Sequence, residues 1–304
     1  MYALSTCWNS SRHTDGRAML REIRELGFDH AELSHGIRVS LLPGVFEAVD
    51  AGEIKISSLH NFCPLPIGVT HAAPNIFQFT SPDPRERESA YRYSLKTLET
   101  AVRARAGIVV LHCGSIDMKE YTDRLLALLE AGLKGTPKYE KLCLEAAEKQ
   151  EQKKERYVQL AHDGVMRLVE QAASRGLKLG IENRERIEEV PPESDLSFFL
   201  KEFSPTTVGY WHDTGHAQIK ENLGFINHAM HLESMADRLL GFHVHDVQLP
   251  GRDHCPPGTG MIDFKALKPW VKPEHIKVIE LSPHVPVEDV QKGFTHLKSV
   301  WGDV

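Results

Sequence analysis

The sequence predicts an α/β chain folded as a closed barrel of eight βα units. Short apolar runs alternate along the chain with longer segments in which apolar residues recur with helical period. Eight such units in 304 residues fit a (β/α)₈ barrel, for which roughly 250 residues plus insertions is usual. The chain has no internal repeat and no low-complexity linker, so residues 1–304 are predicted to form one domain.

The predicted strands cover residues 2–7, 30–33, 55–60, 108–112, 177–182, 208–212, 240–245 and 277–281. The predicted helices between them include residues 16–26, 45–51, 84–105, 164–175, 196–203 and 287–300.

Start and stop signals support several of these helices. Pro84 follows Asp83 just inside a predicted first turn, and the segment 192–195 offers capping residues. Gly27, Gly107 and Gly176 each stand where a helix gives way to a strand, as a left-handed C-terminal cap requires.

One connection between predicted strands is much longer than the others. Residues 117–175 separate the fourth and fifth predicted strands and contain a charged stretch over 138–156. This composition predicts a long solvated helix or a helical hairpin. The alternative is a lid or a subunit contact, and the surface would suit a homodimer or homotetramer.

The composition limits the classes of molecule that this protein is expected to bind. Lys plus Arg number 36 against 42 for Asp plus Glu, a net charge of −6, so no basic field is present to hold nucleic acid. A small molecule is the expected partner. Five cysteines without a C-x-x-C pair predict neither disulfides nor a thiolate zinc site, hence a reducing, cytoplasmic setting. We predict no signal peptide and no membrane span.

The carboxyl ends of parallel barrel strands meet at the face that carries the active site. Here the strand ends carry an unusual number of metal-capable residues: Glu32, His60, His112, Glu182, His212, Asp213, His243, His245, Asp246 and Glu280. A carboxylate is rarely buried without a partner, and Glu182 and Glu280 each follow an apolar strand. The set Glu182, Asp213, His243 and Glu280 therefore predicts one divalent metal ion, which could be Mn²⁺, Mg²⁺, Co²⁺ or Zn²⁺.

These segments resemble the sugar isomerase and epimerase superfamily of xylose isomerase-like TIM barrels, which includes hydroxypyruvate isomerase, inosose dehydratase, ketose 3-epimerases and endonuclease IV. The motifs that carry the resemblance are Ile181-Glu182-Asn183, Asp213-Thr214-Gly215-His216, His243-Val244-His245-Asp246, Leu249-Pro250-Gly251-Arg252, Pro257-Gly258-Thr259-Gly260 and Glu280. The resemblance implies one catalytic metal on the four predicted ligands, with His216 and Arg252 touching the substrate.

The implied chemistry is proton transfer next to a carbonyl. A metal that chelates a carbonyl and a neighbouring hydroxyl oxygen stabilises the enediolate, while Glu182 and Glu280 act as base and acid. The outcome is epimerisation, aldose–ketose isomerisation or dehydration of a sugar, sugar phosphate or keto-polyol. His112, His60 and Trp8 are further expected substrate contacts, although each could instead be structural.

The sequence is also compatible with two other functions. Endonuclease IV shares the barrel and uses several zinc ions, but its Asp-x-His spacing is not reproduced at Asp253 and His254, which are adjacent. A multi-zinc phosphodiesterase is therefore the alternative enzyme, and a barrel that binds a sugar without turnover is the alternative outside enzymes.

Overall fold

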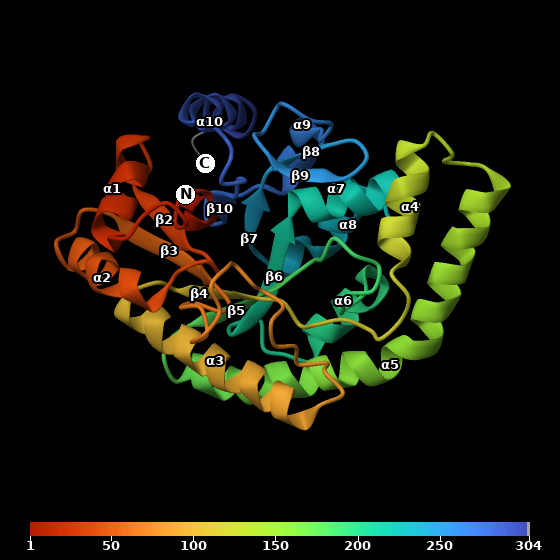
Figure 1. Cartoon of the computed structure of the whole chain (residues 1–304), viewed down its shortest axis with the longest axis horizontal. Coiled ribbons are helices and arrows are strands. Elements are labelled where there is room, and N and C mark those ends of the chain that lie inside the picture. Colours follow the sequence, from red (N-terminus) through yellow and green to blue (C-terminus); the bar gives the residue numbers. More distant parts are fainter. Residues whose placement is uncertain (303–304) are drawn as a thin grey trace.

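The computed structural model describes residues 1–302, and a closed barrel of eight parallel strands forms its centre (Figure 1). The strands are β1 (Tyr2–Ser5), β2 (His30–Leu33), β3 (Lys55–His60), β4 (Ile108–Leu111), β5 (Lys178–Glu182), β6 (Val208–Asp213), β7 (Leu239–Val244) and β10 (Ile276–Ile279). They follow one another round the ring in chain order, and β10 closes on β1. The predicted barrel is confirmed, and every strand bound lies within two residues of its expected position.

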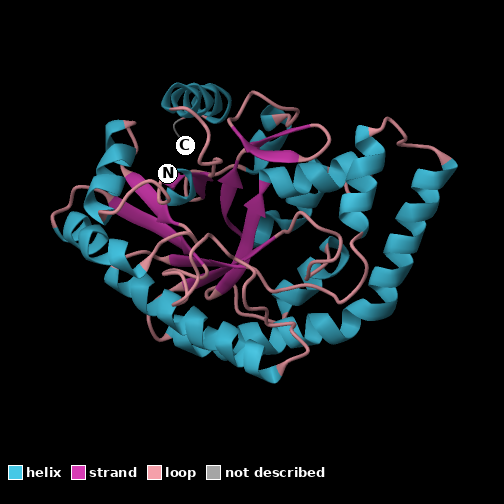
Figure 2. Cartoon of the chain, in the orientation of Figure 1, coloured by secondary structure: helices cyan, strands magenta, loops and turns pink. Residues whose placement is uncertain are grey.

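Helices surround the barrel and loops join them to the strands (Figure 2). The α-helices are α1 (Gly16–Glu25), α2 (Leu42–Asp50), α3 (Pro84–Arg103), α4 (Tyr121–Glu130), α5 (Pro137–Ala173), α6 (Glu193–Lys201), α7 (Thr214–Leu223), α8 (His228–Met235), α9 (Phe264–Leu267) and α10 (Val287–Trp301). The described part of the chain also contains the 3₁₀ turns η1 (Thr6–Trp8), η2 (Val39–Leu41), η3 (Ala236–Arg238) and η4 (Lys268–Trp270). A small antiparallel hairpin joins β8 (Asp246–Gln248) to β9 (Arg252–Cys255) after β7.

Most of the residues that the sequence predicts to begin or end a helix do so in the structure. Asp83 caps α3 by accepting from the backbone N–H of Arg85 at 2.8 Å, with Pro84 in the first turn. Gly27 and Gly176 take left-handed φ values of 92° and 69°. After α3 the left-handed residue is Arg105, with φ 58°, rather than Gly107. Pro192 precedes α6 without a side-chain cap.

The enlarged connection between β4 and β5 is the helical hairpin of α4 and α5. In Figure 1 the hairpin projects from one side of the barrel, and the long α5 then returns beneath it. The carboxylate of Glu188, in the loop after β5, accepts from the backbone N–H of Tyr121 at 2.5 Å and of Thr122 at 3.0 Å. Glu188 therefore caps α4 in place of a local side chain and ties the hairpin to a loop at the mouth of the barrel.

Two apolar cores hold the fold. The larger lies between the strands and the helices, and the smaller fills the barrel with Ala3, Ile108, Val110, Trp211, Ile276 and Val278. Since successive strand residues point to opposite faces, Trp211 and Asp213 face into the barrel while Tyr210 and His212 face the helices. Within residues 1–302, no helix combines the length and the apolar character needed to span a bilayer.

Candidate metal centre

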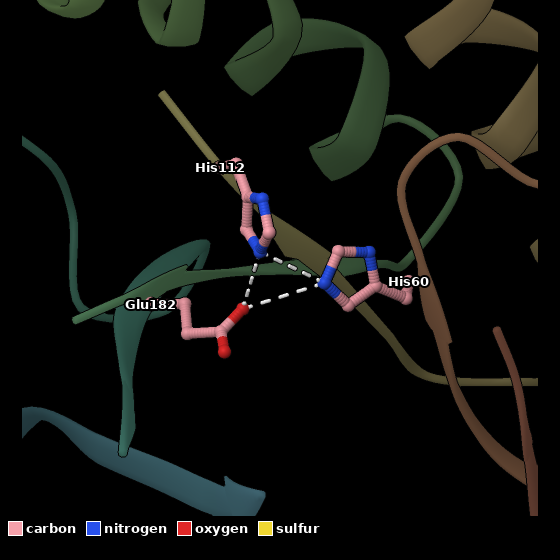
Figure 3. A group of neighbouring side chains, drawn as sticks. All are labelled: His60, His112 and Glu182. Atoms are coloured by element: carbon pink, nitrogen blue, oxygen red, sulfur yellow. Dashed lines mark hydrogen bonds and ion pairs between the residues drawn. The ribbon is translucent and has the colours of Figure 1, made fainter. Parts of the chain in front are cut away.

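Glu182, the last residue of β5, lies among histidines from neighbouring strands. Its Oε2 atom is 3.0 Å from Nε2 of His112 and 3.4 Å from Nε2 of His60 (Figure 3). Its Oε1 atom is 3.4 Å from Nδ1 of His216 and 3.5 Å from Nη1 of Arg184. Burial alone raises the pKa of Glu182, but the His243 and His112 rings together outweigh it and hold that pKa well below its usual range. This carboxyl group is therefore ionised.

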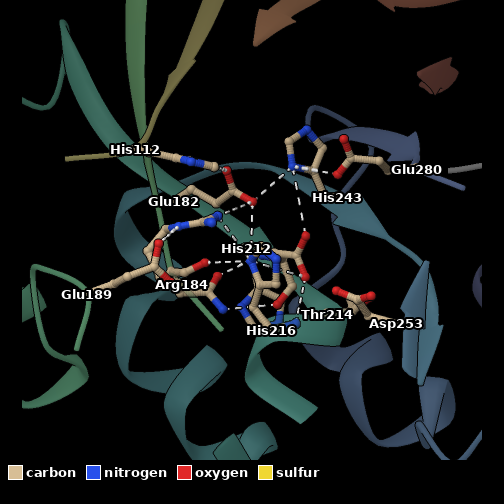
Figure 4. Close-up of polar contacts among 12 residues, drawn as sticks. His112, Glu182, Arg184, Glu189, His212, Thr214, His216, His243, Asp253 and Glu280 are labelled. Atoms are coloured by element: carbon tan, nitrogen blue, oxygen red, sulfur yellow. Dashed lines mark hydrogen bonds and ion pairs between the residues drawn. The ribbon is translucent and has the colours of Figure 1, made fainter. Parts of the chain in front are cut away.

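The four predicted metal ligands converge on one nitrogen atom. Nδ1 of His243 lies 3.1 Å from Oε1 of Glu182, 3.4 Å from Oε2 of Glu280 and 3.9 Å from Oδ2 of Asp213. In Figure 4 the carboxylates of Glu182 and Glu280 lie on either side of the His243 ring. All four side chains are at most 5% exposed. The strand ends thus bring together the residues that the sequence predicts as ligands.

The opposite edge of the His243 ring is held by Glu32 of β2. Both Glu32 carboxylate oxygens are 3.1 Å from Nε2 of His243, and Glu32 itself accepts from the Ser58 hydroxyl at 2.7 Å. Because a carboxylate only accepts hydrogen bonds, Nε2 carries a hydrogen toward Glu32, and Nδ1 is the ring nitrogen that faces the three predicted carboxylate ligands. A metal-binding histidine is oriented in this manner by an acceptor behind it.

The electrostatics of this cluster favour a cation. Burial by itself lowers the pKa of His243, but the charges of Glu280, Glu32 and Glu182 outweigh it and raise that pKa well above the usual range. The field that stabilises a proton at Nδ1 also stabilises a metal ion there. Three carboxylates and one imidazole are a donor set that suits Mn²⁺, Mg²⁺, Co²⁺ or Zn²⁺, so the residues present fit one divalent cation.

Asp213 is fixed from several directions at the junction of β6 and α7. Its Oδ1 accepts from the backbone N–H of His216 at 2.7 Å, and its own backbone N–H donates to Oδ1 of Asn183 at 2.7 Å. Its Oδ2 lies 3.1 Å from Nε2 of His245. Because Nδ1 of His245 accepts from the backbone N–H of His254 at 2.9 Å, Nε2 is the protonated nitrogen and donates to Asp213. His245 therefore orients a ligand, whereas His243 directs Nδ1 toward the three predicted carboxylate ligands.

The tight packing around Asp213 explains the glycine beside it. A Cβ atom at Gly215 would lie 2.0 Å from Cε1 of His245, so only glycine leaves room for that ring. The segment from Asp213 to His216 thus provides a carboxylate, begins a helix and lies in close contact with the segment that carries His245.

Among the predicted substrate contacts, three join this cluster and two do not. His60, His112 and His216 lie against Glu182, as described above. Trp8 is 1% exposed, and its indole N–H donates to the carbonyl of Val285 at 2.8 Å, so the ring belongs to the core. Arg252 is exposed at the start of β9 and lines a separate cavity of about 410 Å³ with Asp289.

A second cavity, of about 320 Å³, reaches the cluster and is lined by the loops after β1, β2, β3 and β10 and by His254 of β9. Glu280 is the predicted ligand that lines it. The lining mixes apolar side chains with the polar residues Ser10, His35, Arg38, His71, His254 and Ser282. This cavity gives a small polar molecule a route to Glu280.

The sequence places Glu32 and His245 at strand ends and predicts that Glu32 anchors a neighbouring histidine or loop, but it does not identify which residues these two support. The partner of Glu32 is His243, 211 residues away in the chain. The role of Asn183 toward Asp213 was not predicted. A polar residue in the middle of the short apolar strand β2 was the available signal.

Comparisons with known proteins agree with the fold. The family model for xylose isomerase-like TIM barrels matches residues 20–300. A D-tagatose 3-epimerase-like protein superposes with a TM-score of 0.69 at 20% identity, over 98% of this chain and 96% of the other. D-psicose 3-epimerase in the presence of D-fructose gives 0.67 at 14% identity over 99% of both chains. The IolI protein with a zinc atom gives 0.66 at 14% identity over 98% of both. No curated protein matches the sequence.

Proposed function

The chain belongs to the xylose isomerase-like TIM barrel family, and from that membership we propose that it is a divalent-metal-dependent isomerase or epimerase of sugars, sugar phosphates or keto-polyols. The observation that carries the proposal is the convergence of Glu182, Asp213 and Glu280 on Nδ1 of His243. The solved structures of similar fold include sugar 3-epimerases, which supports the same class of substrate.

Glu182, Asp213, His243 and Glu280 would hold the cation. When bound, it would supply Lewis-acid polarisation of a substrate carbonyl oxygen, which makes the neighbouring C–H more acidic. The donor set does not select among Mn²⁺, Mg²⁺, Co²⁺ and Zn²⁺.

The protein's own contribution is an acid and a base. Glu280 lines the cavity and is the carboxylate that an entering substrate meets first. Glu182 lies deeper and is ionised, so its carboxylate is in the form that a general base requires. We assign these two as the pair that removes a proton next to the carbonyl and returns one. Return to the opposite face gives an epimer, and return to the adjacent carbon gives an isomer.

Three histidines are the proposed substrate contacts. His60, His112 and His216 surround Glu182, where they can donate to or accept from substrate hydroxyl groups. Burial and the nearby Arg184 lower the pKa of His112 to about 3, so this ring is neutral at physiological pH. A neutral imidazole can hydrogen-bond a hydroxyl without bringing a charge into the site.

The test is hydrogen exchange in deuterated water. The metal-loaded protein is incubated with a panel of ketoses, sugar phosphates, keto-inositols and hydroxypyruvate, and deuterium at carbon is measured by NMR. We expect incorporation into at least one substrate, and a loss of about 10² to 10⁴ in its rate for Glu182→Gln and for Glu280→Gln. Glu288→Gln, an exposed carboxylate on α10, is the matched control. Full exchange in Glu182→Gln would refute the assignment of the base.

A multi-metal phosphodiesterase is the second candidate, because His60 and His112 add two nitrogen ligands beside Glu182. An oligonucleotide with an abasic site tests it directly. Cleavage of that substrate without exchange at any sugar carbon would favour the hydrolase, and binding of a sugar with neither reaction would favour a non-catalytic barrel.

A further inference from the structure

The cavity that reaches Glu280 contains an arginine whose charge no acidic side chain neutralises. Arg38, in the loop after β2, lines this cavity together with Glu280. Among the described residues, Glu280 is the only carboxylate in the lining, and no salt bridge joins Arg38 to any carboxylate. Arg38 is half-buried, so its positive charge attracts an anion that enters the cavity.

Two backbone carbonyl groups hold the guanidinium of Arg38 in place. Its Nη2 atom donates to the carbonyl oxygen of His13 and, at 3.4 Å, to that of Ser10, both in the loop after β1. Nε and Nη1 donate to no described residue, so part of the five-donor fork is available to a ligand. A guanidinium fork of this kind binds two oxygens of a phosphate or carboxylate at once.

A second side chain in the same cavity lacks a hydrogen-bond partner. His35 lies in the same loop as Arg38, and its Nδ1 atom is buried. Within residues 1–302, neither nitrogen of the His35 ring makes a hydrogen bond. The ring packs edge-on against His60, with 4.7 Å between the ring centroids. Unpaired polar atoms of a buried ring are unfavourable, and a ligand oxygen in the cavity supplies the missing partner.

The rest of the polar lining suits a polyhydroxylated molecule that carries an anionic group. Hydroxyl groups of the lining can hydrogen-bond both sugar hydroxyls and anion oxygens. They belong to Ser10, Ser11, Thr70 and Ser282. The cavity volume of about 320 Å³ lies at the small end of the range for small-molecule pockets, roughly 300 to 1,000 Å³, which suits a single sugar unit.

We propose that Arg38 and His35 form a subsite for an anionic group of the substrate, a phosphate or a carboxylate, so that the enzyme acts on a sugar phosphate or a sugar acid in preference to a neutral sugar. The inference rests on the proposed function, in which Glu280 transfers a proton at the carbon next to the carbonyl. Because Arg38 and Glu280 line one cavity without forming a salt bridge, they can contact different parts of one molecule. Arg252, the arginine that the sequence suggests for this role, lines a separate cavity.

The test compares substrates that differ only in the anionic group. Metal-loaded, full-length protein is given sets of a ketose, its terminal phosphate ester and its terminal acid, for example D-fructose, D-fructose 6-phosphate and D-fructuronate. Deuterium exchange at carbon gives kcat/KM for each compound. In at least one set we expect the phosphate or the acid to exceed the neutral ketose by about 10- to 100-fold, and the better of the two identifies the group. Equal values for neutral and anionic members in every active set would overturn the subsite.

Variants show whether Arg38 is responsible. Arg38→Gln should lower kcat/KM for the anionic substrate by about 10- to 100-fold, chiefly through KM, and leave the value for the neutral ketose within about twofold. His35→Phe keeps a ring against His60 and should lower the anionic value by about 3- to 10-fold. Arg85→Gln, at an exposed position on α3, is the matched control that keeps the wild-type values.

A merely structural role of Arg38 gives a different result. An equal loss on anionic and neutral substrates in Arg38→Gln would mean that the arginine only holds the two loops together, and would overturn the subsite. If circular dichroism shows that Arg38→Gln does not fold, the same comparison in His35→Phe decides. A selective loss on the anionic substrate then supports the subsite, and the absence of any selective loss overturns it.

Calorimetric titration with inorganic phosphate and with acetate separates this subsite from the proposed function, because it needs no turnover. Anion binding that weakens by about 10-fold or more in Arg38→Gln, without exchange on any sugar, would keep the subsite and refute the isomerase. Exchange on neutral ketoses alone, with anion binding that does not depend on Arg38, would do the reverse. If neither exchange nor Arg38-dependent binding is found, both proposals are wrong.

Discussion

Glu32 and His243, 211 residues apart in the chain, form a buried pair in which both carboxylate oxygens lie 3.1 Å from one imidazole nitrogen. Neither side chain is exposed to solvent. The pair determines which ring nitrogen of His243 is available to a metal ion.

Replacing Glu32 by glutamine is expected to weaken metal binding by about 10- to 100-fold, because the neutral amide holds the His243 ring less firmly and donates less electron density to it. Competition against a fluorescent chelator measures the affinity. Ser58→Ala, which removes one hydrogen bond to Glu32, should have a smaller effect. Equal affinities for wild type and Glu32→Gln would show that the pair has no influence on the metal.

Removing the metal should lower thermal stability. A cation that binds only the folded chain at 100 times its Kd adds about 2.7 kcal/mol to the free energy of unfolding. We therefore expect the melting temperature to fall after treatment with a chelator and to recover when Mn²⁺ or Zn²⁺ is restored. In Asp213→Asn the recovery should be smaller, because one carboxylate of the cluster loses its charge. A melting temperature that ignores both chelator and metal would contradict the four-ligand site.

The cap that Glu188 provides for α4 predicts a local effect on the hairpin. Glu188→Ala leaves the backbone N–H groups of Tyr121 and Thr122 without their acceptor and is expected to cost about 1–3 kcal/mol of unfolding free energy. Limited proteolysis should then cut between residues 117 and 136 faster than in the wild type. Glu120→Ala is the control, since Glu120 makes no side-chain cap there. Unchanged proteolysis and stability would mean that the hairpin is held by other contacts.

A buried histidine network between β6 and the helices predicts a dependence on pH. Nε2 of His228 is 2.9 Å from Nε2 of His212, and burial, with the nearby His231, lowers the pKa of His228 from 6.5 to about 3. Between these pH values only the unfolded chain binds the proton, so the free energy of unfolding falls as the pH is lowered. It is constant, as far as this group is concerned, above pH 6.5.

Urea denaturation between pH 4 and 7 measures this dependence. One histidine contributes at most about 1.4 kcal/mol per pH unit, and His228→Gln is expected to remove that share of the slope. His296→Gln, at an exposed position on α10, should keep the wild-type slope. Identical slopes for His228→Gln and the wild type would contradict the assignment.

The sequence by itself determined the barrel, because each strand is a short apolar run followed by a helical period, a pattern that depends only on local residues. It also determined which residue types stand at the strand ends, and with them Glu182, Asp213, His243 and Glu280 as candidate ligands. It did not predict α7, because polar and apolar residues are mixed along this segment and form no apolar stripe of helical period, even though nine of its ten residues are buried.

Only the tertiary structure decided how those side chains divide between roles. Adjacent strand residues point to opposite faces, so Asp213 enters the barrel while His212 packs against α8, although both are polar neighbours in the sequence. Closure of the ring brought Glu32 to His243 and placed His60 and His112 beside Glu182. The physical reason is that the local residue pattern determines where a strand forms. Which side chains meet across the barrel depends instead on the register between strands that lie many residues apart in the sequence.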